Sequence, residues 1–572
     1  MELGCARFRV WGPRAGRMRV QIGGRVPSVH EMRSEADGWW ALDVPGAGPG
    51  SDYGYVIDDD AEAVPDPASR WQPYGVQGLS RVYDQDAFGW TDARWTGRPL
   101  AGAVIYELHV ATFTPGATFD SAILRLGHLA ELGVTHVELL PVNAVDGVWN
   151  WGYDGVGWYA VHEPLGGPDG LKRFVDACHG RGMAVVLDVV YNHLGPAGDY
   201  LPRFGPYLKG GGNSWGELIN VNAQQSGPVR RFIVDNALMW LADFHFDGLR
   251  LDAVQALSDT STPHLLAQLA VEVDALSAHL QRPLTLIAES DLNDPIMITP
   301  REAHGYGLHA QWDDDVHHAL HALLTGERQG YYCDFGSLAT LAKVLTHAFF
   351  HDGTYSGFRQ RRYGAPIDRA ATAGYRFVVC LQNHDQVGNR AAGKRLSELT
   401  TPGLLRVGAV LLLTAPFTPM LWMGQEWAAS TRWPYFSSHR DADLAKAISK
   451  GRAEEFSRQG WDPAQLVDPQ DPQTYYSAVL DWDEPLRSGH TEMLDLYRRL
   501  IALRRAEPHL SDPRLDLVHV DYNQAEQWLT VHRGPLRVAV NLADHTQTLP
   551  GVAGSVLLAT DQATRIGSGL QL

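Results

Sequence analysis

Hydrophobic residues in the middle of the chain form short, nearly continuous runs, and most runs are followed by a stretch with helical periodicity. The run at 183–193 is mostly Val and Leu before it ends in Tyr-Asn-His, and the run at 103–110 is similar. Nearly continuous apolar strands are typical of burial on both faces, as in a parallel sheet with helical crossovers. About eight such strand–helix units between residues 101 and 424 predict a (β/α)8 TIM barrel of the α/β class.

The predicted elements of this barrel follow one another in a regular order. Strands are expected at 103–110, 135–142, 183–193, 246–254, 284–290, 311–313, 375–385 and 419–424. Helices are expected at 122–132, 170–180, 230–244, 263–280, 337–349 and 402–414, and an amphipathic helix at 492–505 would close the barrel. The continuous apolar runs separate the strands from the helices, whose apolar residues recur with a period near 3.6.

The two ends of the chain have a different pattern, in which apolar and polar residues alternate. Residues 1–90 alternate between Gly-, Pro- and Asp-rich turns, which predicts an N-terminal β-sandwich. Residues 510–572 alternate again, which predicts a C-terminal antiparallel β-domain. The catalytic barrel is therefore expected at 91–509, with a small Gly- and Tyr-rich excursion at 194–227 over its mouth.

Composition and charge exclude several classes of partner. The chain has 572 residues, 45% of them hydrophobic, and a net charge of −18, which disfavours nucleic acid and anionic membranes as partners. The segment 1–13 lacks the pattern of a signal peptide, and the longest apolar run is broken by Thr and Pro, so a cytoplasmic protein without a membrane span is expected. The four cysteines are isolated, which suggests neither a zinc site nor a disulfide framework.

Two charged residues stand out in the predicted strand 246–254. Arg250 and Asp252 are two positions apart, so they point to the same side of the strand. Buried charges are costly unless they are paired or used. Taken alone, the pair fits a structural ion pair between two strands as well as it fits an active site.

The residues at the ends of the other predicted strands favour the second interpretation of this pair, an active site. Active sites of such barrels lie at the carboxyl ends of the strands. Polar residues gather at these ends: Asp188, His193, Arg250, Asp252, Glu289, His384 and Asp385. Crowded carboxylates shift one another's pKa and can divide the roles of acid and nucleophile, which is what glycoside hydrolysis requires.

These strand ends resemble the four signature regions of the α-amylase superfamily, glycoside hydrolase family 13, across roughly residues 100–510. The resemblance implies that Asp252 is the nucleophile, Glu289 the general acid/base and Asp385 the carboxylate that stabilises the transition state. It also implies further substrate-binding or supporting residues: Tyr153, which would stack under the sugar, His193, His384, Arg250 as the partner of Asp252, and Asp188 as the partner of Arg250.

Details within the superfamily narrow the resemblance. Residues 253–256 are Ala-Val-Gln-Ala, where endo-α-amylases usually carry Lys-His, and Ser290 stands where isoamylases and pullulanases usually carry an aromatic residue. The chain instead resembles the maltooligosyltrehalose trehalohydrolase family at 65–70, 105–110, 150–156, 247–254, 288–294, 384–390 and 468–472. That resemblance implies retaining hydrolysis of the α-1,4 bond next to the terminal trehalose of maltooligosyltrehalose, beside a partner enzyme that forms the trehalose end.

Several other residues are candidates for the rim of the barrel. Five aromatic residues are expected in rim loops, either as a pocket for the leaving trehalose or only as loop packing: Trp215, Trp312, Tyr331, Tyr332 and Phe335. His109, Asp313 and Glu426 are rim positions without an assigned role. The mechanism requires no cofactor or metal, although some superfamily members bind calcium where Asn143 and Asn192 stand here. No carboxylate cluster in the sequence requires a Ca²⁺ site.

Two other functions remain open from the sequence. The first is a glycogen branching or debranching enzyme of the same superfamily, which acts on α-1,6 bonds. The second is a non-catalytic glycan-binding protein built on an amylase barrel, which the presence of all three candidate carboxylates disfavours. The N-terminal segment also resembles a glycan-binding module, and here it either binds sugar or only supports the barrel.

Overall fold

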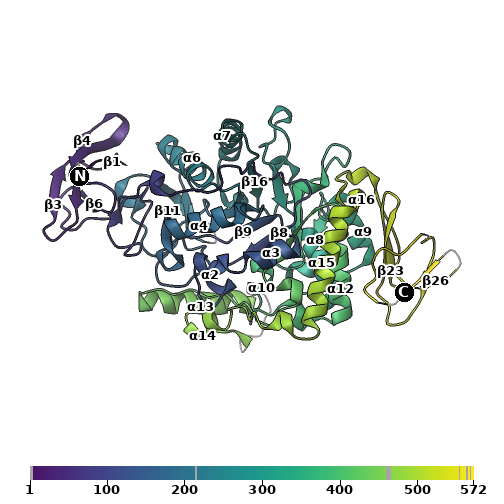
Figure 1. Cartoon of the computed structure of the whole chain (residues 1–572). Helices are drawn as coiled ribbons and strands as arrows, with labels where there is room; N and C mark the ends of the chain where they lie inside the picture. Colours follow the sequence, from purple (N-terminus) through teal and green to yellow (C-terminus); the bar gives the residue numbers. More distant parts are fainter. Residues whose placement is uncertain (1–3, 213–214, 459–464, 553, 562–563, 567–568) are drawn as a thin grey trace.

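The structure, a computed structural model, describes residues 4–212, 215–458, 465–552, 554–561, 564–566 and 569–572. Along the chain these residues form two antiparallel sheets, a closed barrel of eight parallel strands, and further antiparallel sheets. The N-terminal and C-terminal sheets lie at opposite ends of the molecule, with the barrel between them (Figure 1). The predicted TIM barrel with β-rich ends is therefore confirmed, whereas the domain limits at 90/91 and 509/510 stay predictions.

The barrel is closed by hydrogen bonds between the first and last of its strands, in the order β12-β15-β16-β17-β20-β21-β8-β9. Almost every strand residue is buried, because side chains fill the barrel on one face and helices cover the other. The strands are β8 (Ile105–Leu108), β9 (His136–Leu139), β12 (Ala184–Val189), β15 (Gly248–Leu251), β16 (Thr285–Ala288), β17 (Ala310–Trp312), β20 (Phe377–Cys380) and β21 (Thr418–Trp422).

Helices between these strands form the outer layer of the barrel. The last crossover, α12, occupies the predicted range: Pro402 opens it, the Thr401 side chain caps it, and it ends at Thr414. The helices are α2 (Phe119–Ile123), α3 (Leu126–Leu132), α4 (Gly167–His179), α6 (Ser226–Asp243), α7 (Leu265–Leu280), α8 (Asp314–Thr325), α9 (Leu338–His347), α12 (Pro402–Thr414) and α15 (His490–Ala506).

The structure corrects the sequence predictions in three places. The strand predicted at 375–385 ends at Cys380, and Asn383 caps a short helix, α10 (His384–Gly388), so His384 and Asp385 are helical. The helix predicted at 122–132 is two helices, α2 and α3. Helix α8 was not predicted at all, because its Asp- and His-rich start hides its apolar positions. Apolar runs therefore report burial more faithfully than they report hydrogen-bonded strand length.

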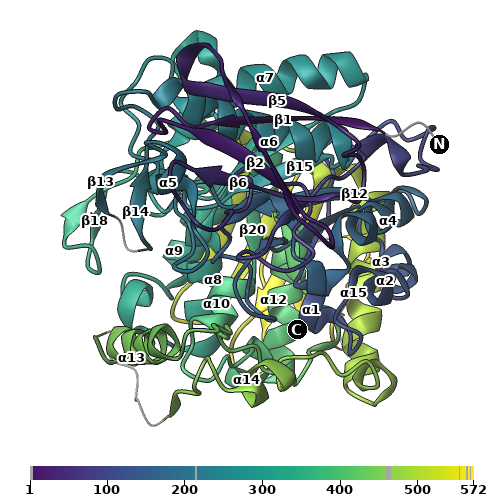
Figure 2. The same cartoon turned by 90° about the vertical axis from the view of Figure 1, so that its left-hand side faces the viewer.

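The N-terminal sheets pack on each other and on the excursion that follows β12. One sheet has the order β1-β5-β4 and the other β3-β2-β6-β7, and in Figure 2 their strands cross in front of the barrel. Phe204 of the excursion makes an edge contact with the Tyr55 ring, 6.0 Å between centroids, which ties the two regions together. The strands are β1 (Cys5–Trp11), β2 (Met18–Ile22), β3 (Ser28–Glu31), β4 (Arg33–Ser34), β5 (Trp39–Pro45), β6 (Asp52–Ile57) and β7 (Ser80–Arg81).

Two interruptions of the barrel, the predicted excursion at 194–227 and a polar stretch at 427–486, contain short elements of their own. The excursion contains α5 (Leu201–Phe204), β13 (Leu208–Gly212) and β14 (Glu217–Ile219), and its residues 213–214 lie outside the described residues. The polar stretch at 427–486 contains α13 (Ala442–Arg458) and α14 (Pro472–Tyr476), and its residues 459–464 lie outside them as well. Within the described part of the chain, no helix has the length and apolar character needed to cross a membrane.

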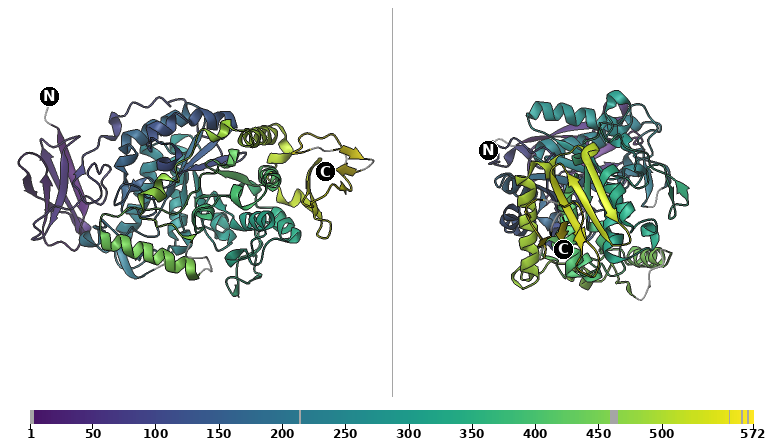
Figure 3. Two further views of the ribbon diagram at one scale, coloured as in Figure 1. Left: turned by 90° about the horizontal axis from the view of Figure 1, so that it is seen from below. Right: turned by 90° about the vertical axis from the view of Figure 1, so that its right-hand side faces the viewer.

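A buried arginine anchors the C-terminal sheets to the barrel. Arg533, in the C-terminal sheet, donates to the carbonyl of Thr414 at the end of α12 at 3.4 Å and to the carbonyls of Leu510 and Asp512 at 3.1 and 2.7 Å. Figure 3 shows the sheet of β22 (Val518–Asn523), β23 (Trp528–Arg533) and β24 (Leu536–Asn541) covering this end of the barrel. The second sheet consists of β25 (Thr548–Leu549), β27 (Gly569–Gln571) and β26 (Thr564–Ile566).

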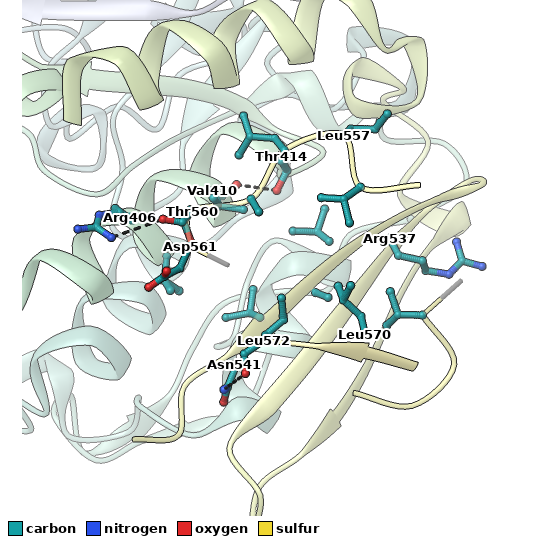
Figure 4. Close-up of a pocket in the computed structure, with 18 of the residues that line it drawn as sticks. Arg406, Val410, Thr414, Arg537, Asn541, Leu557, Thr560, Asp561, Leu570 and Leu572 are labelled. Atoms are coloured by element: carbon teal, nitrogen blue, oxygen red, sulfur yellow. Dashed lines mark hydrogen bonds between the residues drawn. The ribbon is translucent and has the colours of Figure 1, made fainter. Parts of the chain in front are cut away.

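A cavity of about 630 Å³ lies between α12 and the C-terminal sheets (Figure 4). Its walls are mainly aliphatic, with Val410 of α12 on one side and Leu557, Leu570 and Leu572 on the other. It contains none of the residues predicted to form the active site. The size of a cavity alone is therefore a poor guide to the chemistry of this protein.

Candidate active site

A fully buried arginine forms the floor of the site. Arg250 lies in β15, directly opposite Asp188 of the neighbouring strand β12 in the sheet register. Its Nη1 donates to Asp188 Oδ2 at 2.6 Å and to Asp252 Oδ1 at 2.8 Å. Its Nη2 approaches Glu289 Oε2 at 3.5 Å. One guanidinium therefore contacts three of the carboxylates that the sequence singled out.

Asp252 is oriented through both of its carboxylate oxygens. It follows the last residue of β15, and its Oδ2 accepts a hydrogen bond from Asn192 Nδ2 at 2.8 Å, while Oδ1 accepts from Arg250. Asn192 Nδ2 also donates to the carbonyl of Asp252 at 2.9 Å. The sequence offered Asn192 only as a calcium-site remnant, although its place beside His193 at a strand end is the signal that could have marked it.

Glu289 is held at the adjacent strand end and is largely neutral. Its Oε2 accepts a hydrogen bond of 2.5 Å from the backbone N–H of Ala253, the residue after Asp252. Ala253 adopts a left-handed conformation with φ of 40°, which turns that N–H toward Glu289. Burial, reinforced by nearby carboxylates and opposed by Arg250, raises the pKa of Glu289 to about 8. At neutral pH the group is therefore mostly protonated and can donate a proton.

Asp385 and His384 lie at the start of α10, on the other side of the site. The Asp385 side chain is 45% exposed, compared with 13% for Asp252 and 15% for Glu289, so it is the most open of the three carboxylates. His384 Nε2 lies 3.5 Å from Asp385 Oδ2. Burial disfavours the charged imidazole, but the carboxylates of Asp385 and Glu107 outweigh it and raise the pKa of His384 to about 9.

Tyr153 connects the two sides of the site. Its hydroxyl donates to Asp188 Oδ2 at 2.6 Å and lies 2.8 Å from His384 Nε2. Its ring is nearly parallel to the His384 ring, at 5.0 Å and 21°. His193 Nε2 donates to the carbonyl of Tyr153 at 2.9 Å, and its Nδ1 lies 2.5 Å from Asn192 Oδ1. The predicted sugar-contacting residues are thus joined in one hydrogen-bonded group.

The predicted aromatic rim residues separate into different environments. Trp312 was expected both in the strand at 311–313 and among the rim-loop aromatic residues; the strand is confirmed and the loop is wrong. It is the last residue of β17, 4% exposed, with its ring 4.3 Å from the Arg250 guanidinium carbon. Tyr332 and Phe335 are buried beside α8. Trp215 is 52% exposed and lies nearly parallel to the His193 ring. Tyr331 donates to Gln386 Oε1 at 3.2 Å, one residue after Asp385.

Three further rim candidates make structural contacts. His109 binds the carbonyl of Asn150 at 3.0 Å, and Asp313 caps α8 through the backbone N–H of Asp315. Glu426 accepts hydrogen bonds from His128 at 2.8 Å and from the hydroxyl of Tyr106. Each side chain is therefore used to hold a loop or a helix end.

The site contains no arrangement suited to a metal ion within the described residues. No group of three His, Cys, Asp or Glu side chains in that part of the chain is placed to hold one. Asn143, a position linked to calcium by the superfamily resemblance, donates to the carbonyl of Trp158 at 2.6 Å. The polar groups of the site are thus paired carboxylates and an arginine.

Comparisons with known proteins place these features in a family context. A protein-family model described as "Alpha amylase, catalytic domain" matches residues 113–204. A second model, of a domain of unknown function (DUF3459), matches residues 513–572. The malto-oligosyltrehalose trehalohydrolase of Arthrobacter ramosus is 53% identical over 99% of this chain and 98% of its own length. The enzyme of the same name from Rhizobium sp. (strain M-11) is 51% identical over 100% of this chain and 96% of its own.

A solved structure agrees with these sequence matches. The crystal structure of a Salmonella typhimurium protein is 36% identical to this chain and superimposes with a TM-score of 0.90. The match covers 99% of this chain and 97% of the Salmonella chain, so it includes the barrel and the sheets at both ends. The whole architecture is therefore shared with the Salmonella protein.

Proposed function

The chain belongs to the malto-oligosyltrehalose trehalohydrolase family, and we propose that its reaction depends on Asp252, Glu289 and Asp385. It is a glycoside hydrolase of the α-amylase superfamily, and its family hydrolyses the bond that joins a maltooligosaccharide to a terminal trehalose. For this chain the substrate is accordingly maltooligosyltrehalose and the product is free trehalose. The contact of Arg250 with Asp188, Asp252 and Glu289 at 2.6, 2.8 and 3.5 Å carries the assignment.

In the first step, Glu289 donates its proton to the glycosidic oxygen of the leaving trehalose. A carboxylate oxygen of Asp252 attacks the anomeric carbon from the opposite face, the carbon–oxygen bond to trehalose breaks, and a β-glycosyl ester forms. The pKa of Glu289 near 8 keeps that proton available at neutral pH. The hydrogen bonds from Arg250 and Asn192 hold the Asp252 carboxylate in one orientation for the attack.

In the second step, Glu289 is a carboxylate and removes a proton from a water molecule. The water oxygen attacks the anomeric carbon, the ester bond to Asp252 breaks, and the maltooligosaccharide leaves with its α-configuration retained. Retaining enzymes place the two carboxyl groups about 5–5.5 Å apart. The Arg250 guanidinium that reaches both groups supports such a spacing.

The remaining residues of the site bind the sugar that is attacked. Asp385 and His384 hydrogen-bond its hydroxyls as the ring flattens toward the oxocarbenium-like transition state, and Tyr153 stacks below it. His193 completes this subsite, while Trp312 supports Arg250 from behind. Trp215, exposed beside His193, is the proposed contact for the leaving trehalose. A partner enzyme that forms the trehalose end supplies the substrate.

The products released from two substrates of similar length test this function. The purified protein is incubated with maltotriosyltrehalose and, separately, with plain maltopentaose. Trehalose and maltotriose are expected from the first, and much slower hydrolysis from the second. Equal rates on both substrates would indicate an ordinary amylase, and newly formed or cleaved α-1,6 bonds would indicate a branching or debranching enzyme.

A further inference from the structure

We propose that Glu107 is the positioning residue that fixes His384, and through it the sugar-binding side of the site. The inference rests on the proposed function and deepens it, because His384 is there one of the residues that grip the attacked glucose. Glu107 lies in β8, the first strand of the barrel, and its carboxylate is buried inside the barrel below the site.

The Glu107 carboxylate binds His384 at two points. Oε1 lies 2.5 Å from His384 Nδ1, and Oε2 accepts a hydrogen bond of 3.1 Å from the His384 backbone N–H. The ring contact fixes the rotation of the imidazole, and the backbone contact fixes the first residue of α10. Asp385 is the next residue of that helix, so the same carboxylate also fixes the position of the Asp385 backbone.

The contact also determines which protons His384 carries. The single hydroxyl proton of Tyr153 is donated to Asp188, so the Tyr153 oxygen can only accept from His384 Nε2, 2.8 Å away. Both ring nitrogens of His384 therefore donate, one to Glu107 and one to Tyr153, and the ring is an imidazolium. A chain of hydrogen bonds then runs from Glu107 through His384, Tyr153, Asp188 and Arg250 to Asp252.

Glu138 provides the contrast that makes this role specific. It is the register partner of Glu107 on the neighbouring strand β9, and it is buried at the same level of the barrel. Neither of its carboxylate oxygens has a hydrogen-bond partner among the described residues, and burial raises its pKa well above its ordinary value. Glu138 is thus neutral, whereas the Glu107 carboxylate faces a donor, the His384 ring.

Charged and titratable groups face His384 from several elements. Glu107 of β8, Asp385 of α10, Arg250 of β15 and His109 act on it, together with the Tyr153–Asp188 pair, while Glu138 of β9 faces it as a neutral carboxyl. Asp385 Oδ2 lies 3.5 Å from the ring and Glu107 Oε1 lies 2.5 Å from it, so Glu107 is the nearer of the two anions, while burial and Arg250 oppose the ring charge. Loss of the Glu107 charge should therefore let His384 lose its proton at lower pH.

The experiment compares Glu107→Gln with the matched control Glu138→Gln in the full-length protein. For Glu107→Gln we expect a fall in kcat of about 10- to 100-fold. This is the range found when carboxylates that orient metal-ligating histidines are replaced. Glu289 sets the alkaline limb of the wild-type kcat–pH profile near pH 8, and in Glu107→Gln we expect this limb to move to lower pH because the pKa of His384 falls below that of Glu289. Glu138→Gln should leave both kcat and that limb unchanged, because one neutral group replaces another. Glu107→Asp, which keeps the charge, should keep the limb near its original pH.

A direct titration of His384 separates this inference from the proposed function. Histidine NMR measures the His384 pKa in the unliganded wild type and in the Glu107→Gln variant, without any substrate. A lower pKa in the variant supports the inference, whatever sugar the enzyme turns out to release. An unchanged His384 pKa and an unchanged pH profile in a folded Glu107→Gln variant would overturn it, and so would an equal effect of Glu138→Gln.

Discussion

The two ends of strand β15 carry buried charges that are used in different ways. Asp247 directly precedes the strand, and its two oxygens accept four hydrogen bonds: from Trp95 and Arg282 on one oxygen, and from His179 and the Val185 backbone on the other, at 2.7–2.9 Å. Four acceptor positions are thus filled by four protein donors. An ion cluster saturated in this way has no capacity left for a ligand, and it stabilises the fold.

The charges at the other end of the strand are not saturated by protein. Arg250 Nε and Nη2, Asp188 Oδ1 and Trp312 Nε1 are buried polar atoms without a hydrogen-bond partner among the described residues. Asp252 and Asp385 remain partly exposed beside them. For β15, incomplete satisfaction distinguishes the reactive end of the strand from the other end, whereas burial and charge do not, because both ends share them.

The largest expected effect is a loss of activity that occurs at only one of the two ends of β15. Asp252→Asn should lower kcat on the order of 10⁴-fold, because the nucleophile is lost while its shape and most of its hydrogen bonds remain. The measurement is the initial rate of trehalose release from maltotriosyltrehalose at saturating substrate. Asp247→Asn is the matched control at the other end, and its kcat per folded molecule should equal that of the wild type. Full activity in Asp252→Asn would remove the assigned nucleophile.

The next effect separates the two ends by stability. Asp247→Asn should lower the free energy of unfolding by about 3–5 kcal/mol, since it leaves Arg282 and His179 as buried cations without their shared anion. Urea denaturation of wild type and variant measures the change. Asp252→Asn should cost much less stability, because Asp252 is partly exposed. If the Asp252 variant loses more stability than the Asp247 variant, the contrast between the two ends is wrong.

A third effect is the pH dependence of the reaction. Glu289 must carry its proton to act as the acid, and burial together with its neighbouring carboxylates raises its pKa to about 8. The value of kcat should therefore fall as the pH rises through about 8, without loss of fold. Steady-state rates between pH 6 and 10, with circular dichroism at each pH as the control, test this. A rate that stays constant up to pH 10 would argue against Glu289 as the acid.

The smallest effect is the pH dependence of stability at the saturated end. Burial opposes the charged form of His179, but Asp247 and Asp92 outweigh it and raise its pKa above 6.5. A raised pKa stabilises the fold fully below pH 6.5, and this contribution is lost as the pH rises through the pKa of folded His179. His179→Gln should therefore show a smaller decline of the melting temperature above pH 6.5 than the wild type. Identical declines in both proteins would rule out His179 as the source.

Much of the barrel could be predicted from local sequence because its strands are buried on both faces. The run ending in Asp188 and the run ending in Asp252 are apolar over lengths that fit few other structures, and α12 was predicted with its observed limits. The prediction failed where the pattern of apolar residues does not correspond to the secondary structure of the backbone. Burial continues past Cys380 into α10, and the Asp- and His-rich start of α8 hid that helix.

The sequence by itself determined the order of the elements and which strand ends carry carboxylates, since both follow from short-range periodicity. Only the tertiary structure decided which of these side chains became partners. Glu107 meets His384 across 277 positions of the chain because barrel closure sets β8 beside β21 and β9. Glu138 is one strand away from Glu107 and finds no such donor among the described residues. A contact of that range depends on how the barrel closes, which no local pattern contains.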